Sequence, residues 1–118
     1  MKYFPLFADL DGADVLVAGG GEQAAQKVRL LLKTGARIAV VAEAACEELV
    51  ALGERKAIDL LRRPLRANDV RGRRLVCAVT GDRALDAALS RTAKAQGVPV
   101  NVVDAPELST IIMPAIVD

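Results

Sequence analysis

Histidine and tryptophan are both absent from this chain of 118 residues. Without histidine there is no imidazole for acid–base chemistry near neutral pH and no histidine-containing metal site, so carboxylates are left as the most suitable catalytic groups. Aromatic residues make up only 3% of the chain, whereas hydrophobic residues make up 53%. This composition predicts a core of Val, Leu, Ile and Ala, which is typical of a buried parallel sheet covered by helices.

Cysteine, net charge and long apolar runs are also scarce. Cys46 and Cys77 are too few and too far apart for a metal motif, and Cys77 is interpreted as a small buried apolar residue. The formal net charge of +1 does not favour nucleic-acid binding. No apolar run reaches membrane-spanning length, and the N-terminal residues do not form a signal peptide. We therefore expect one cytoplasmic domain over residues 1–118, with no metal site and neither nucleic acid nor membrane as a partner.

A glycine-rich turn separates an apolar strand pattern from a helical pattern near the N-terminus. Gly19, Gly21 and Ala24 together form the G-x-G-x-x-A fingerprint of dinucleotide binding. Gly19 permits a tight turn, Gly21 lets the backbone approach a pyrophosphate, and Ala24 lets the helix pack closely on the strand. The unpaired N–H groups of the helix's first turn would then face the phosphates. The alternative is a structural turn in a flavodoxin-like domain that binds another ligand.

The apolar periodicity predicts five strands that alternate with helices. The expected strands are residues 14–19, 37–42, 57–61, 74–80 and 98–103, and the expected helices are residues 22–34, 44–55 and 84–95. This alternation predicts an α/β fold with a doubly wound parallel sheet of Rossmann type and strand order 3-2-1-4-5. The apolar segment over residues 111–117 would be poorly placed as a free tail, so we expect the natural protein to continue.

Two further residues are expected beside the cofactor. Glu43 lies 24 residues after Gly19, about where a carboxylate receives the ribose hydroxyls of a dinucleotide. A carboxylate there would repel a 2′-phosphate, so NAD is favoured over NADP. Glu43 could equally be a solvated residue near the start of the next helix. Thr80 ends the fourth strand beside the expected switch point, where its backbone could line the cofactor crevice.

Several segments of the chain follow one family pattern. They are residues 4–7, residues 15–22, residues 27–32 with Gly35 and Ala36, residues 100–106, and residues 112–118. Together they resemble the N-terminal NAD-binding domain of siroheme synthase, in the precorrin-2 dehydrogenase/sirohydrochlorin ferrochelatase family. The resemblance implies NAD-dependent oxidation of the tetrapyrrole precorrin-2 to sirohydrochlorin, with Fe²⁺ insertion in bifunctional members. It also implies a homodimer whose following dimerisation and substrate region is absent here, and in nature a possible fusion to a methyltransferase.

Carried over by position, the resemblance assigns NAD contacts to Glu22, Gln23, Glu43 and Ala44. It assigns the catalytic role to Asp104, which ends the fifth strand. Independently of the family, ligands of open α/β sheets bind outside the carboxyl ends of the strands. A carboxylate there could take a proton while a hydride leaves, or pass a divalent cation to the macrocycle. The alternative is an aspartate that caps the turn at residues 105–106.

Six arginines gather in one short interval, at positions 62, 63, 66, 71, 73 and 74. We interpret them as a solvated loop around the third and fourth strands. The alternative is a surface that holds the carboxylates of a tetrapyrrole. Two other functions also remain open for the chain, namely a non-catalytic NAD-sensing regulatory domain and the cofactor domain of another dehydrogenase.

Overall fold

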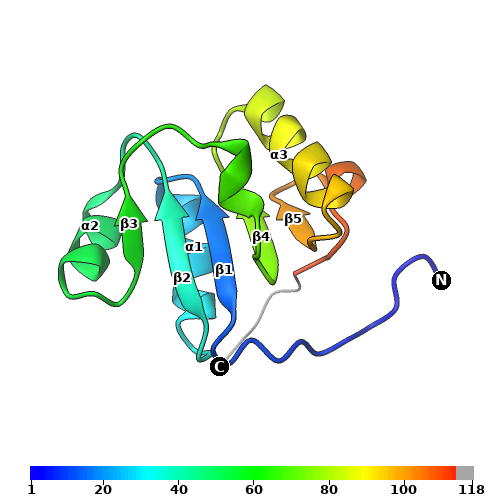
Figure 1. The fold of residues 1–118 in the computed structure, drawn as a ribbon, viewed down its shortest axis with the longest axis horizontal. Helices are drawn as coiled ribbons and strands as arrows, with labels where there is room; N and C mark the ends of the chain where they lie inside the picture. Colours follow the sequence, from blue (N-terminus) through cyan, green and yellow to red (C-terminus); the bar gives the residue numbers. More distant parts are fainter. Residues whose placement is uncertain (114–118) are drawn as a thin grey trace.

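The computed structural model of the protein describes residues 1–113. Five parallel strands form one sheet in the order β3-β2-β1-β4-β5, with helices on both faces (Figure 1). The strands are β1 (Asp14–Ala18), β2 (Arg37–Val41), β3 (Asp59–Leu61), β4 (Leu75–Ala78) and β5 (Val100–Val102). The predicted doubly wound fold and its strand order are therefore confirmed.

The helices are α1 (Glu22–Leu31), α2 (Glu47–Glu54) and α3 (Arg83–Ala95). Two short 3₁₀ turns, η1 (Ala67–Val70) and η2 (Pro106–Leu108), are additional to the predicted elements. Helix α2 begins three residues later than the apolar pattern predicts. The reason is a long-range contact, because the N–H of Cys46 donates to the carbonyl of Gly20 at 2.8 Å. Residues 42–46 consequently form a loop at the end of β2.

Alternate residues of the central strands face opposite layers of the fold, as the period of a strand requires. Val15, Val17 and Cys77 pack against α1 and α2. Leu16 and Val76 pack on the other side, against α3 and η1. All five side chains are fully buried. Burial raises the pKa of the Cys77 thiol to about 11, which agrees with the interpretation of Cys77 as an apolar core residue.

The last residues of all five strands lie in one register row. Ala18 is level with Val41 on one side and with Ala78 on the other. Val41 is in turn level with Leu61, and Ala78 with Val102. The loops that follow the strands therefore emerge at a single edge of the sheet. The strand order reverses between β1 and β4, which is where such folds bind their ligands.

The N-terminal arm, residues 1–10, has no helix or strand and runs away from the sheet (Figure 1). Phe4 and Phe7 on this arm are exposed. The family-like ending from Pro114 onward lies outside the described residues. Within residues 1–113, no helix is long and apolar enough to cross a membrane, and no group of three or more Cys, Asp or Glu side chains could hold a metal ion.

The turn η1 is held in place by the nearly buried carboxylate of Asp69. Arg63 donates from Nη1 and Nη2 to the two oxygens of Asp69, at 2.9 and 2.7 Å. The backbone N–H of Arg66 donates to the same carboxylate at 2.7 Å. The paired Arg63 guanidinium lowers the pKa of Asp69. Part of the arginine cluster is thus structural, which differs from the interpretation of a solvated loop.

Replacing Asp69 with Asn is expected to destabilise the protein at neutral pH. Because the folded-state pKa of Asp69 is lowered, its stabilising contribution is present above the ordinary aspartate pKa and is lost as the pH falls through the folded value. The difference in free energy of unfolding between wild type and Asp69→Asn should therefore shrink between about pH 7 and about pH 3. Urea denaturation at both pH values measures this, with Asp59→Asn at an exposed aspartate as control. A difference that stays constant across this range contradicts the assignment.

Candidate functional site

A groove of about 660 Å³ lies at the carboxyl edge of the sheet, among the loops that follow β1, β2, β3 and β4. Five of the residues predicted to bind the cofactor line it, namely Gly19, Gly21, Glu43, Ala44 and Thr80. A wider hollow of about 800 Å³ lies beside the amino ends of β2 and β3 and the end of α2. None of the predicted residues lines that second hollow. The groove at the carboxyl edge is therefore the candidate site.

The three consecutive glycines of the turn have different surroundings. A Cβ on Gly19 would overlap the carbonyl of Val79, and Gly19 also has a φ of +137° that side chains disfavour. A Cβ on Gly20 would overlap the carbonyl of Ala44. A Cβ on Gly21 would instead meet nothing within 4 Å. The first two glycines permit close packing of loops, and Gly21 leaves open space where a ligand can approach the backbone.

The structure also requires a glycine at position 20, although the dinucleotide fingerprint assigns no role to this position. Its carbonyl accepts the hydrogen bond from Cys46 that delays the start of α2. The presence of a third glycine within the run is the sequence signal that could have identified it. Gly20 therefore links the turn after β1 to the loop after β2, which carries Glu43.

The first turn of α1 presents backbone donors at the groove. Gly21 is the N-cap of α1 and makes no side-chain cap hydrogen bond. The first N–H groups of a helix have no partner within the helix, and its dipole favours an anion there. Glu22 and Gln23 are exposed on this turn, whereas Ala24 is fully buried against the sheet. The three residues do not themselves line the groove, and Ala24 packs as the fingerprint predicts.

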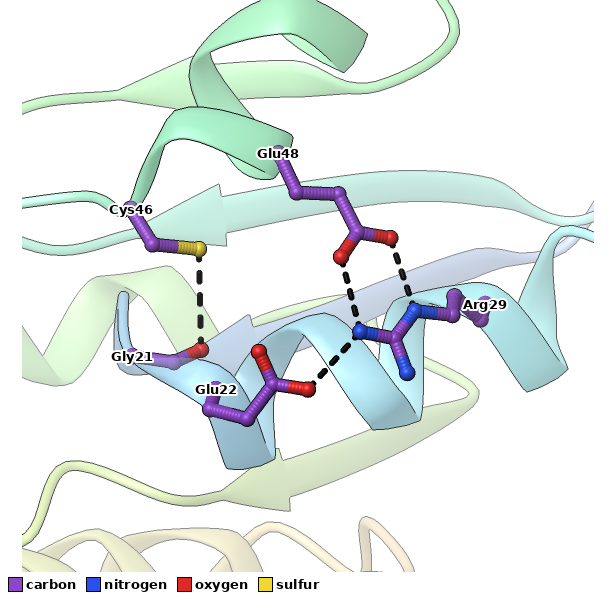
Figure 2. A network of polar contacts seen from close by, with 5 residues as sticks. All are labelled: Gly21, Glu22, Arg29, Cys46 and Glu48. Carbon is purple, nitrogen blue, oxygen red and sulfur yellow. Dashed lines mark hydrogen bonds and ion pairs between the residues drawn. The ribbon is translucent and has the colours of Figure 1, made fainter.

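Arg29 links the helix that starts at the glycine turn to helix α2 (Figure 2). Its Nε and Nη2 donate to the two carboxylate oxygens of Glu48, both at 2.7 Å, and Nη2 also donates to Glu22 at 2.8 Å. These contacts raise the pKa of Arg29 and lower that of Glu48. All three side chains are partly exposed, so these contacts add little to the stability of the fold. Their main effect is to fix the position of α1 relative to α2. The carboxylate of Glu22 is occupied by Arg29.

Glu43 and Ala44 lie in the loop between β2 and α2, and both line the groove. Cys46 is the N-cap of α2, so Glu43 lies before the helix rather than in its first turn. Within residues 1–113 the carboxylate of Glu43 makes no hydrogen bond and no ion pair. It is therefore available to accept hydrogen bonds from a ligand that carries hydroxyl groups.

Thr80 lines the groove, but its hydrogen-bonding groups are used by the turn after β4. Its hydroxyl and its backbone N–H both donate to Oδ1 of Asp86, at 2.7 and 3.1 Å, and the hydroxyl accepts from the N–H of Asp82 at 3.1 Å. Asp82 also caps α3 by accepting from the N–H groups of Ala84 and Leu85. Thr80 thus shapes the wall of the groove without a free donor.

Asp104 follows β5 at the same edge of the sheet and is exposed. Its φ of +55° lies in the left-handed region, which aspartate tolerates better than most residues. Its carboxylate makes no hydrogen bond or ion pair in the described part of the chain, so the turn-capping alternative is not observed. Its neighbours Val103 and Ala105 line a small hollow of about 160 Å³ together with Gly81, which follows Thr80. Asp104 itself lies outside the lining of the groove.

Arg63, Pro64 and Leu65 also line the groove, although the sequence does not predict them as site residues. They follow β3, and the side chain of Arg63 is only 26% exposed because Asp69 binds it. A single acidic residue inside the arginine-rich interval is the signal that could have identified this pair.

The chain matches a known protein family, known proteins and solved structures. Residues 6–115 match the family described as "Putative NAD(P)-binding". The chain is 48% identical to a siroheme synthase from Stutzerimonas stutzeri and 51% identical to one from Pseudomonas putida, in each case over 100% of this chain and 25% of the relative. It thus spans about a quarter of the length of the curated relatives it matches. The solved structure of SirC, precorrin-2 dehydrogenase, superposes with a TM-score of 0.81 and 25% identity, covering 96% of this chain and 55% of SirC.

Two glycine substitutions are expected to separate folding from binding. Gly20→Ala should lower the free energy of unfolding by about 1–3 kcal/mol, because its Cβ would overlap the Ala44 carbonyl. Gly21→Ala should leave the urea midpoint almost unchanged but weaken NAD binding about tenfold, since its methyl group occupies the open approach to the backbone. Calorimetric titration measures the binding. Equal affinity of wild type and Gly21→Ala would place the dinucleotide elsewhere.

Proposed function

Because the chain belongs to the NAD(P)-binding family that it matches over residues 6–115, we propose that it is the NAD-binding domain of a precorrin-2 dehydrogenase of siroheme biosynthesis. The observation that carries this proposal is the groove in which the glycine turn and Glu43 lie together at the switch point of the sheet. The similarity to siroheme synthases and to SirC supports the tetrapyrrole substrate. Residues 1–118 form this domain, and a dimerisation and substrate region follows it in the complete protein.

The residues of the groove fit a dinucleotide. The open space at Gly21 and the unpaired N–H groups at the start of α1 suit a pyrophosphate, with Glu22 and Gln23 contributing backbone donors. The unpartnered carboxylate of Glu43 accepts the ribose hydroxyls, with Ala44 beside it. Thr80 contributes the wall on the side of β4. The negative charge of Glu43 favours NAD over NADP.

Oxidation of precorrin-2 removes one hydride and one proton from the substrate. Bound NAD⁺ supplies the hydride acceptor. The carboxylate of Asp104 accepts the proton, and its exposure at the end of β5 leaves it accessible to a substrate lying over that edge. In a bifunctional enzyme the same carboxylate accepts pyrrole protons as Fe²⁺, the second substrate, enters the macrocycle.

The complete protein acts as a cytoplasmic homodimer in this proposal. The exposed side chains of Phe4 and Phe7 on the N-terminal arm support an interface, because large apolar groups favour burial against another surface. Sedimentation equilibrium of the complete protein is expected to give the mass of two chains. A single-chain mass at every concentration would contradict the dimer.

Replacing Asp104 with Asn in the complete protein tests the catalytic assignment. Asparagine tolerates the left-handed backbone at this position, so the fold should be retained. The rate of NAD-dependent sirohydrochlorin formation is expected to fall by about 10²–10⁴-fold, while the affinity for NAD stays unchanged. An unchanged rate would contradict the catalytic role of Asp104. NAD binding by the wild type without any oxidation of precorrin-2 would instead favour the NAD-sensing regulatory alternative.

A further inference from the structure

The groove has a wall that the dinucleotide fingerprint does not explain. Arg63, Pro64 and Leu65 form it after β3. If the pyrophosphate lies at the start of α1 and a ribose lies at Glu43, the strand order puts this wall beyond that ribose, on the side of the adenine. The wall therefore meets the part of the ligand that has a flat aromatic ring.

The guanidinium of Arg63 is held in a fixed plane. Its two terminal nitrogens donate to the two oxygens of Asp69, and Nη1 also donates to the carbonyl of Pro64 at 3.1 Å. The Asp69 side chain is only 8% exposed, so this pair is anchored to the body of the domain. A bidentate pair fixes both the position and the plane of a guanidinium. Because Nη1 and Nη2 are bound to Asp69, the flat face of the Arg63 guanidinium is the part that remains for the groove. A flat cationic face is suited to stacking on an aromatic ring.

We propose that Arg63 is a specificity-determining residue that stacks on the adenine ring of the cofactor, and that Asp69 keeps the N–H edge of Arg63 from binding a 2′-phosphate. This inference rests on the proposed NAD-binding function and deepens it. Asp69 acts through Arg63 and is a positioning residue. Together with the carboxylate of Glu43, the pair accounts for a preference of this groove for NAD over NADP.

Arg63→Lys tests the stacking, because lysine keeps the positive charge but has no flat face. Arg62→Lys is the matched control, since Arg62 is exposed and does not line the groove. Calorimetric titration of the complete protein should show NAD binding weakened about tenfold by Arg63→Lys and unchanged by Arg62→Lys. Binding of nicotinamide mononucleotide, which has no adenine, should be the same in all three proteins. Equal NAD affinity in Arg63→Lys and wild type would overturn the stacking.

Asp69→Asn and Asp69→Ser test the second part of the proposal, with circular dichroism used to show that at least one of them is folded. Releasing the N–H edge of Arg63 should raise the affinity for NADP relative to NAD by about fivefold or more. An unchanged ratio in a folded variant would overturn the role of Asp69. Should neither variant fold, the same ratio is measured in Asp69→Glu, whose longer side chain keeps the charge but should loosen the bidentate pair and shift the ratio in the same direction. A wild-type protein that binds neither dinucleotide would overturn the proposed NAD-binding function itself. This outcome differs from a failure of the roles of Arg63 and Asp69, in which the wild type still binds NAD.

Discussion

The site depends on the close approach of the backbone at Gly19 and Gly20 to the loops after β4 and β2. A side chain at either position would overlap a neighbouring carbonyl, Val79 in one case and Ala44 in the other. Because of this approach, the ends of β1, β2 and β4 lie close together. The hydrogen bond from the N–H of Cys46 to the carbonyl of Gly20 fixes the position of the loop that carries Glu43. The groove thus results from packing that only residues without a Cβ allow.

Much of the fold could be predicted because its signals are local and repeated. The apolar strands and amphipathic helices alternate regularly along the chain, and right-handed crossovers then leave few possible orders for five parallel strands. The start of α2 and the turn η1 could not be predicted in the same way. They depend on the contacts of Cys46 with Gly20 and of Asp69 with Arg63, which join residues whose proximity the local pattern does not show.

In the candidate site, too, some residues could be predicted from local patterns and others could not. Gly19, Gly21, Glu43, Ala44 and Thr80 were predicted as cofactor-binding residues, and all five line one groove. Arg63 was missed because an arginine in a charged interval is usually solvated, and its burial follows from the carboxylate that pairs with it. Asp104 was predicted as the catalytic residue from the family resemblance, and it lies after β5, at the same edge as the groove but outside its lining. The residues predicted for cofactor binding and for substrate chemistry thus lie in neighbouring parts of one edge.

In the proposed binding mode, a dinucleotide lies with its phosphates at the start of α1 and its ribose at Glu43. Hydrogen–deuterium exchange of the complete protein, with and without NAD, tests this placement most directly. We expect NAD to slow amide exchange in two segments, residues 20–24 and residues 43–46, because bound ligand shields these amides and reduces local opening. Unchanged exchange in both segments at saturating NAD, or protection confined to the hollow beside β3 and the end of α2, would show that NAD does not bind in this way.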